Sequence, residues 1–169
     1  SLEIGKMTFK FKICDAVGLC RNVIDMVEKI KQTHADVRFS TPLDSLELLT
    51  DSARLQQVLI NLLINATKFT SQGSITLQLE QQTEDTALFS VTDTGTGIPK
   101  EKQKKIFNRF EKLGGHKNGT GLGLAICRQI AVIFGGEIHV DPDYTGGARF
   151  VFSHPIRSEK PRQGPAREG

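Results

Sequence analysis

The feature that most constrains the fold is a long amphipathic helix predicted between Asp51 and Phe69. Apolar residues recur there three and four positions apart, which gives a broad apolar stripe. The stripe consists of Leu55, Val58, Leu59, Leu62, Leu63 and Ala66. Asp51 or Ser52 is suited to cap the first turn. A helix of this kind has to bury its stripe against another layer of the fold.

Strand-like and helix-like segments are interleaved along the rest of the chain. Alternation predicts a strand at residues 8–13, and Asp15 is suited to cap a helix that follows, with apolar positions at Val17, Cys20, Val23, Ile24, Val27 and Ile30. Further strands are expected at residues 37–40, 74–80, 87–93, 137–140 and 148–152, the second and third of these as a hairpin. A short helix after Pro99 and a long one from near Gly121 to Gly135 complete the pattern. This order predicts a two-layer α/β sandwich, in which a mixed, mostly antiparallel sheet carries its helices on one face.

Composition excludes several classes of protein. Hydrophobic residues make up 38% and charged residues 24% of the 169, which is an ordinary globular balance. No apolar run approaches the roughly 18 residues of a membrane span. The net charge of +3 is not gathered into a basic block with interleaved aromatic residues, so no nucleic-acid partner is expected. The three cysteines, Cys14, Cys20 and Cys127, are widely spaced and odd in number, which favours reduced thiols.

Three polar side chains share one side of the long helix. At about 100° per residue, Asn61, Asn65 and Lys68 fall within a narrow sector beside the apolar stripe. Asparagine is a poor helix former, so two of them in one column favour a polar site over a solvated surface. Amide oxygens suit a hard cation such as Mg²⁺, and lysine suits phosphate oxygens.

A second candidate site lies at the end of the strand at residues 87–93. Phe89, Val91 and Asp93 share one face, so the carboxylate points toward the core and needs hydrogen-bond donors. The alternative is an aspartate that merely caps a turn. Gly95 and Gly97 allow the backbone to approach a flat ligand, and Ile98 adds apolar surface. An adenine ring would present its amine to Asp93 and a face to Ile98.

A glycine-rich segment precedes the third long helix. Glycines at alternate positions expose successive N–H groups, and the helix N-terminus adds positive potential, which together favour an anion site over a flexible turn. The spacing is neither that of a P-loop nor that of a dinucleotide-binding turn. The segment comprises Gly119, Thr120, Gly121, Leu122, Gly123 and Leu124.

Taken in order, these motifs resemble those of sensor histidine kinases. Residues 57–70 resemble the N box of that family, residues 93–99 its first glycine box, residues 106–110 its F box and residues 119–124 its second glycine box. The resemblance extends from about residue 2 to residue 156. It implies the Bergerat ATP-binding fold, which gyrase, Hsp90-type chaperones and mismatch-repair ATPases share.

The resemblance also implies the cofactors ATP and Mg²⁺ and a role for each candidate residue. Asn65 would be the main Mg²⁺ ligand, with Asn61 beside it, and residues 112–118 would form a lid over the nucleotide. Hydrolytic relatives carry a glutamate general base at the position of Asn61, and an amide cannot take a proton from water. Asn61 and Lys112 are therefore assigned to phosphoryl transfer. The other implied contacts are Lys68 and Lys112 with the phosphates, Phe69 with the adenosine and Asp93 with the adenine amine.

The expected acceptor histidine is missing from this chain. In the resembling family it lies on a helical hairpin, whereas His34, His116, His139 and His154 suit surface or packing roles better. Residues 1–7 are interpreted as the end of that hairpin and its seam, residues 8–156 as the catalytic domain and residues 157–169 as a disordered tail. Because the chain begins at Ser1, it is interpreted as a piece of a longer protein.

The partners implied are the dimerisation and histidine phosphotransfer domain of the same kinase and, downstream, the receiver domain of a response regulator. The fragment is expected to be a monomer and the full-length kinase a homodimer. The resemblance implies a cytoplasmic domain and allows a parent protein anchored in the inner membrane. Two alternatives stay open: a nucleotide-sensing interaction module without phosphoryl transfer, and a protein serine kinase of the same fold.

Overall fold

The structure is a computed structural model, and it describes residues 2–4, 7–108 and 123–157. The helices are α1 (Ala16–Ile30), α2 (Ser52–Phe69) and α3 (Gly123–Phe134), with two 3-10 turns, η1 (Lys100–Lys102) and η2 (Lys105–Phe107). The strands are β1 (Leu2–Ile4), β2 (Met7–Phe9), β3 (Lys12–Asp15), β4 (Asp36–Ser40), β5 (Glu47–Thr50), β6 (Ser74–Thr83), β7 (Thr86–Asp93), β8 (Ile138–Val140) and β9 (Arg149–Pro155).

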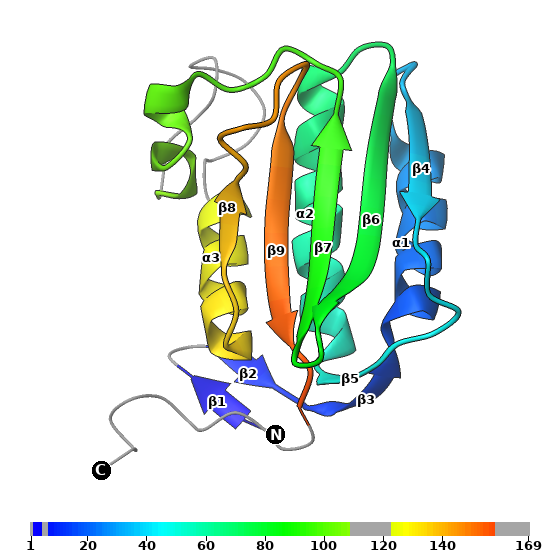
Figure 1. The fold of residues 1–169 in the computed structure, drawn as a ribbon, viewed down its shortest axis with the longest axis vertical. Helices are drawn as coiled ribbons and strands as arrows, with labels where there is room; N and C mark the ends of the chain where they lie inside the picture. Colours follow the sequence, from blue (N-terminus) through cyan, green and yellow to red (C-terminus); the bar gives the residue numbers. More distant parts are fainter. Residues whose placement is uncertain (1, 5–6, 109–122, 158–169) are drawn as a thin grey trace.

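One five-stranded sheet organises these elements. Its strand order is β4-β6-β7-β9-β8, with β4 parallel to β6 and every other neighbouring pair antiparallel. The three helices lie together on one face of this sheet (Figure 1). Two small sheets, β1-β2 and β3-β5, lie at one end of it. The predicted two-layer sandwich with a mixed, mostly antiparallel sheet is therefore confirmed.

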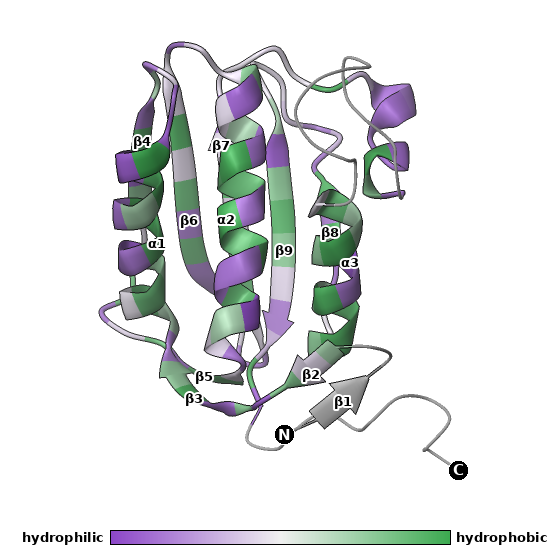
Figure 2. Cartoon of the chain, turned by 180° about the vertical axis from the view of Figure 1, so that it is seen from behind, coloured by the Kyte–Doolittle hydropathy of each residue, from purple (hydrophilic) through white to green (hydrophobic). Residues whose placement is uncertain are grey.

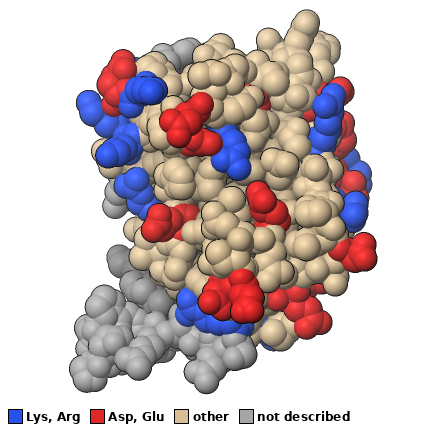
Figure 3. All heavy atoms as spheres, in the orientation of Figure 1, with Lys and Arg blue, Asp and Glu red and all other residues tan. Residues whose placement is uncertain are grey.

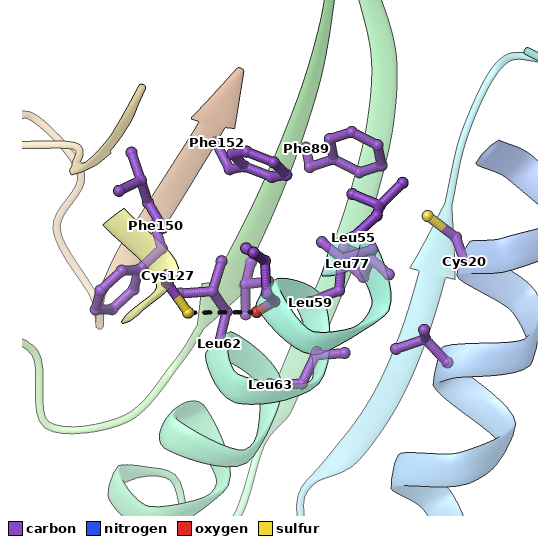
Figure 4. Packing of buried hydrophobic residues seen from close by; sticks show 14 of the residues in the cluster. Cys20, Leu55, Leu59, Leu62, Leu63, Leu77, Phe89, Cys127, Phe150 and Phe152 are labelled. Carbon is purple, nitrogen blue, oxygen red and sulfur yellow. Dashed lines mark hydrogen bonds between the residues drawn. The ribbon is translucent and has the colours of Figure 1, made fainter. Parts of the chain in front are cut away.

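The core lies between the sheet and the helices, with α2 at its centre. All six residues of the predicted apolar stripe on α2 are at most 1% exposed. Leu59 and Leu62 pack toward Phe150, Phe152 and Leu77 of the sheet (Figure 4). Burying a leucine side chain contributes about 2 kcal/mol, so this stripe is the main attachment of α2 to the sheet. In Figure 2, α1 is likewise hydrophobic toward its neighbours and hydrophilic on its outer edge.

The capping residues were predicted correctly. Asp15 accepts hydrogen bonds from the backbone N–H groups of Val17 and Gly18 at the start of α1. Asp51 accepts from the Arg54 N–H with Oδ1 (3.1 Å) and from the Lys10 N–H with Oδ2 (2.7 Å). The second contact fixes the segment after β2 to the first turn of α2. At the end of α3, Gly135 adopts φ 92°, as a glycine C-cap requires.

Several predictions about the N-terminal half were wrong. The single strand expected at residues 8–13 is divided into β2 and β3, because the two parts pair with different partners, β1 and β5. Ile13 is consequently 60% exposed, although the alternation placed it on the same face as the buried Phe9 and Phe11. Strand β5 was not predicted. Ile30, the last residue of α1, is 59% exposed and does not belong to the core.

The segment after Pro99 also differs from the prediction. In place of one short helix, the chain forms the two 3-10 turns, and Pro99 lies just before the first of them. Ile106 and Phe107 are buried there, as expected for a segment that packs on the core. Figure 3 shows basic side chains gathered over this corner of the molecule with acidic side chains among them. Lys100, Lys104 and Lys105 are exposed, which fits the solvated surface predicted for the lysine-rich stretch.

Candidate nucleotide site

Asp93 ends β7 and is 3% exposed. Its Oδ1 accepts hydrogen bonds from the backbone N–H groups of Gly95 (2.9 Å) and Ala148 (3.1 Å). Burial raises the pKa of this carboxyl above its ordinary value, while these two bonds and the nearby Thr70 hydroxyl lower the pKa in part. Because both backbone donors are bound to Oδ1, the second carboxylate oxygen remains to accept from a ligand.

The loop after Asp93 packs tightly on the end of α2. The Thr96 N–H donates to the Phe69 carbonyl oxygen (3.2 Å). A Cβ atom at Gly95 would overlap that same carbonyl oxygen and would lie 2.6 Å from the Thr70 Oγ1. Only glycine therefore allows this approach of β7's loop to α2, which brings the predicted Asp93 site and the predicted helix site together.

We expect the Gly95→Ala variant to be destabilised by about 2 kcal/mol, because the added methyl group forces the loop and the end of α2 apart. Urea denaturation followed by circular dichroism measures this. Gly123→Ala is the matched control, since a Cβ at Gly123 meets nothing closer than the Asn61 Nδ2 at 4.0 Å. Equal stability of the two variants would contradict the close packing described here.

The three polar residues Asn61, Asn65 and Lys68 lie on α2 beside its buried stripe, as their spacing predicts. Asn61 and Asn65 are half-buried, and Lys68, one turn further on, is exposed. A Cβ atom at Gly123, the first residue of α3, would lie 4.0 Å from the Asn61 Nδ2. Phe69 is half-buried at the last position of the helix, next to the Asp93 loop. The last residue of α2 therefore contacts the Asp93 loop, while Asn65 lies one turn before the end of the helix and Asn61 near its middle.

The available donors fit a hard cation better than a transition metal. Among the described residues, no three His, Cys, Asp or Glu side chains form a group able to bind a metal ion. Amide oxygens from Asn61 and Asn65, completed by water and phosphate oxygens, are the ligand types that Mg²⁺ accepts.

Several residues around Asp93 were missed in the sequence analysis. The Tyr144 hydroxyl donates to the Asp93 carbonyl oxygen (3.3 Å), and Gly147 passes so close to Asp93 that a Cβ there would overlap its backbone. The Thr70 Oγ1 is buried beside the Asp93 carboxylate without a hydrogen bond of normal geometry to any described residue. The adjacent glycines Gly146 and Gly147 were a usable signal, because paired glycines mark close backbone approach.

The remaining predicted site residues divide into two groups. Gly97 (φ 77°) and the half-buried Ile98 continue the loop after Asp93, and Gly123 and Leu124 begin α3 near Asn61. The others lie outside the described residues; they are Lys112, Gly119, Thr120, Gly121 and Leu122. The proposed lid, His116 and Phe110 lie there as well.

A groove of about 710 Å³ lies away from this site, at the other end of α2. It is formed by β2, β3 and the first turns of α2. The residues that line it include Lys10, Lys12, Ile13 and Arg54. Within the described part of the chain, no helix has the length and apolarity that a membrane crossing requires.

Comparison with known proteins places this geometry in a family. A sequence model for the "Histidine kinase-, DNA gyrase B-, and HSP90-like ATPase" family matches residues 50–158, which include α2, the Asp93 loop and α3. The chain belongs to this ATPase family. The four motifs of the sequence, from the N box to the second glycine box, all fall within the matched residues.

Sensor kinases are among the relatives of this ATPase-family chain. The adaptive-response sensory kinase SasA of Parasynechococcus marenigrum is 35% identical over 164 residues, which cover 92% of this chain and 43% of SasA. The aerobic respiration control sensor protein ArcB of Escherichia coli K12 is 38% identical over 112 residues, 63% of this chain and 14% of ArcB. The chain thus spans less than half the length of these relatives.

Solved structures of histidine kinases share the fold of this ATPase-family domain. The catalytic domain of histidine kinase ThkA superposes with a TM-score of 0.77 at 34% identity, covering 88% of this chain and 99% of that domain. Full-length ShkA in complex with AMPPNP gives a TM-score of 0.79 at 29% identity, covering 93% of this chain and 33% of ShkA. ThkA in complex with the response regulator TrrA gives a TM-score of 0.71 at 31% identity, covering 87% of this chain and 42% of that ThkA chain.

Proposed function

We propose that this domain binds Mg-ATP and donates the γ-phosphoryl group to a histidine on a separate dimerisation domain of a sensor histidine kinase. The observation that carries the proposal is that two half-buried carboxamides, Asn61 and Asn65, lie on the helix whose end packs against the loop of the buried Asp93 carboxylate. Such a pairing offers hard oxygen ligands and an acceptor for an adenine amine within one site. The ShkA complex with AMPPNP supports a nucleotide as the ligand.

Each side chain has a distinct task in this proposal. Asp93 accepts from the adenine amine, with Ile98 and Phe69 beside the base and sugar. Asn65 and Asn61 supply oxygens to Mg²⁺, which neutralises phosphate charge when bound. Lys68, Lys112 and the N–H groups of the glycine-rich segment contact the phosphates. That segment comprises Gly119, Thr120, Gly121, Leu122, Gly123 and Leu124.

The side chain at position 61 favours transfer over hydrolysis. A water nucleophile needs a base to take its proton, and the Asn61 amide cannot serve as one. Transfer to an imidazole nitrogen needs mainly alignment of donor and acceptor and neutralisation of charge. We therefore assign Asn61 and Lys112 to positioning the phosphates for transfer.

The acceptor and the later partner lie on other polypeptide segments in this proposal. His139 is exposed in β8 and His34 lies beyond the end of α1, and we propose that neither is the acceptor. We propose the dimerisation and phosphotransfer domain of the same kinase as the direct partner and a receiver domain as the next one. Residues 1–7 form the seam to that domain, residues 8–156 the catalytic domain and residues 157–169 a linker. The isolated domain is proposed to be a cytoplasmic monomer and its parent a homodimer, with an inner-membrane anchor in the parent.

Phosphoryl transfer in trans tests the proposal. With γ-labelled ATP and Mg²⁺, the isolated chain is expected to retain no label, whereas addition of the cognate hairpin domain gives an acid-labile, alkali-stable label on that domain. Asn65→Ala is expected to reduce labelling at least about a hundredfold, because an oxygen ligand of the cation is lost. Asn22→Ala, which alters an exposed asparagine on α1, serves as the control.

The other outcomes of this experiment separate the alternatives. Stable label on the isolated chain would refute a separate acceptor. An alkali-labile product would indicate a serine kinase, and nucleotide binding without any transfer would indicate an interaction module.

A further inference from the structure

The loop between β8 and β9, residues 141–148, forms hydrogen bonds with three groups of Asp93. The Ala148 carbonyl oxygen accepts from the Asp93 backbone N–H (2.9 Å), and the Ala148 N–H donates to the Asp93 Oδ1 (3.1 Å). The Tyr144 hydroxyl donates to the Asp93 carbonyl oxygen (3.3 Å). In Figure 1, this loop passes beside the end of β7, to which Asp93 belongs. Both the backbone and the carboxylate of Asp93 are therefore held by one neighbouring loop.

Contacts between its two ends fix the shape of this loop. The Asp141 carboxylate pairs with the Arg149 guanidinium (2.9 Å), and each of these side chains is 24% exposed. The Asp141 N–H also donates to the Arg149 carbonyl oxygen (2.8 Å), and the Asp143 N–H donates to the Asp141 Oδ1 (2.9 Å). Tyr144 is the next residue and is half-buried. Its side chain therefore projects from a constrained segment, so its contact with Asp93 costs little further conformational entropy.

Gly147 approaches the same carbonyl oxygen of Asp93 from the backbone of the loop. A Cβ at Gly147 would lie 1.9 Å from that oxygen, so only glycine fits there. The Gly147 carbonyl oxygen in turn lies 3.2 Å from the position that a Cβ at Gly97 would take, so the loop also packs on the segment after Asp93. This close approach of the two backbones keeps the Tyr144 hydroxyl within hydrogen-bonding distance of Asp93.

The carbonyl group and the carboxylate of Asp93 are linked through the residues that follow. The carbonyl belongs to the planar peptide group between Asp93 and Thr94, whose orientation sets the position of Gly95. The Gly95 N–H donates to the Asp93 Oδ1 (2.9 Å). A phenol that holds this peptide group therefore also holds the donor to Oδ1, and with it the direction of the second carboxylate oxygen.

We propose that Tyr144 is a positioning residue, which holds the Asp93 carboxylate in the orientation that accepts from the exocyclic amine of adenine. This inference rests on the proposed function, in which Asp93 binds that amine. A carboxylate held by several donors cannot turn to follow a ligand, so it favours a base that places an amine before its second oxygen. Loss of the phenol hydroxyl weakens the preference for adenine and leaves the phosphate and Mg²⁺ contacts unaltered.

Tyr144→Phe tests this role, because it removes the hydroxyl and keeps the ring. Two nucleotides are compared: ATP, and purine riboside triphosphate, which is ATP without the exocyclic amine. We expect the variant to bind Mg-ATP roughly threefold more weakly, as for the loss of one long hydrogen bond, and to bind the amine-free nucleotide as the unaltered chain does. Calorimetric titration, by displacement for the weaker ligand, measures the ratio of the two dissociation constants. A ratio equal to that of the unaltered chain would overturn the proposal.

Thr41→Val is the matched control. The Thr41 hydroxyl likewise donates to a strand carbonyl oxygen, that of Leu79 (2.7 Å). Leu79 pairs with Phe89, four residues from Asp93 along β7. A general loss of stability in the sheet would affect the two variants alike, whereas we expect the ratio of dissociation constants to change only in Tyr144→Phe. An equal change of the ratio in both variants would leave Tyr144 a structural role alone and refute the proposal.

A carbonyl resonance reports the contact with Asp93 directly. The Asp93 carbonyl carbon, detected through the Thr94 amide in a triple-resonance spectrum, is expected to shift in Tyr144→Phe and to stay unchanged in Thr41→Val. An unchanged resonance in Tyr144→Phe would show that the hydrogen bond is absent and would overturn the proposal. If the unaltered chain bound neither nucleotide, or bound both equally, the proposed adenine site itself would fail, whatever this resonance showed.

Discussion

The Asp93→Asn variant is expected to bind ATP roughly a hundredfold more weakly than the unaltered chain while remaining folded. Its Oδ1 can still accept from the Gly95 and Ala148 N–H groups, so the loop geometry is retained. The other oxygen becomes an NH₂ group, which would oppose the amine of an adenine in the proposed site with a second donor. Loss of a charge-assisted bond and an unpaired amine in a buried site together cost about 3 kcal/mol.

Calorimetric titration and thermal unfolding of the same samples check this prediction. Burial raises the pKa of Asp93, which means that folding disfavours its ionised form at neutral pH. The neutral asparagine removes that penalty, so the variant is expected to unfold at the same temperature or higher. Asp85→Asn, at the exposed hairpin turn before β7, is the control for the loss of one charge.

The pH dependence of ATP binding follows from the same group. In the proposed site, the carboxylate form of Asp93 would accept a hydrogen bond from the adenine amine, and protonation of the carboxylate would weaken that bond. Since its pKa in the free protein lies above the ordinary value, affinity is expected to begin falling at a higher pH than an exposed aspartate would allow. ATP affinity of Asp93→Asn equal to that of the unaltered chain would remove Asp93 from the adenine site.

The second large effect is expected at His154, in β9, where acid should destabilise the fold by about 3 kcal/mol. The side chain is 2% exposed, its Nδ1 hydrogen-bonds the Pro155 carbonyl oxygen (2.8 Å), and its Nε2 accepts from the Thr50 hydroxyl (2.9 Å). The pKa of His154 is lowered from 6.5 to about 4, mainly by burial. The hydrogen bond to Pro155 raises this pKa in part, and the charge of Arg157 lowers it further. Between pH 6.5 and about 4, the His154 imidazole is therefore protonated in the unfolded chain but stays neutral in the folded chain.

Stability is thus fully present above about pH 6.5 and is lost progressively as the pH falls toward 4. Each pKa unit between the folded and unfolded states corresponds to about 1.4 kcal/mol, so the lowered pKa of His154 gives the loss of about 3 kcal/mol. Urea unfolding at a series of pH values measures the slope. His154→Gln is expected to be less stable at neutral pH and to have a flatter profile, whereas His139→Gln, on the exposed side of β8, should retain the original slope. A profile of His154→Gln as steep as the original would show that another group is responsible.

Strong periodicity made most of the fold predictable. The stripe of α2, the aspartate caps and the hairpin of β6 and β7 each depend on contacts between residues near one another in sequence, so local patterns were sufficient. The burial of Asp93 was predictable for the same reason, because Phe89 and Val91 share its face of β7.

Features that depend on distant pairing were not predictable. Strand β5 has no alternation of its own and exists because it pairs with β3. The exposure of Ile13 follows from the change of partner between β2 and β3, which no property of residues 8–13 reveals. Thr70 and Tyr144 were missed as neighbours of the candidate site because each approaches Asp93 only when separate elements pack.

The one parallel pair of the sheet, β4 with β6, ties the site to the order of folding. Parallel neighbours need a crossover connection, and here α2 is the helical part of that connection. The hydrogen bonds between β4 and β6 therefore close a long loop, which costs conformational entropy. The packing of α2 on the sheet offsets that entropic cost. We therefore expect the helix that carries Asn61 and Asn65, the proposed ligands of Mg²⁺, to unfold together with the edge of the sheet rather than to fray locally.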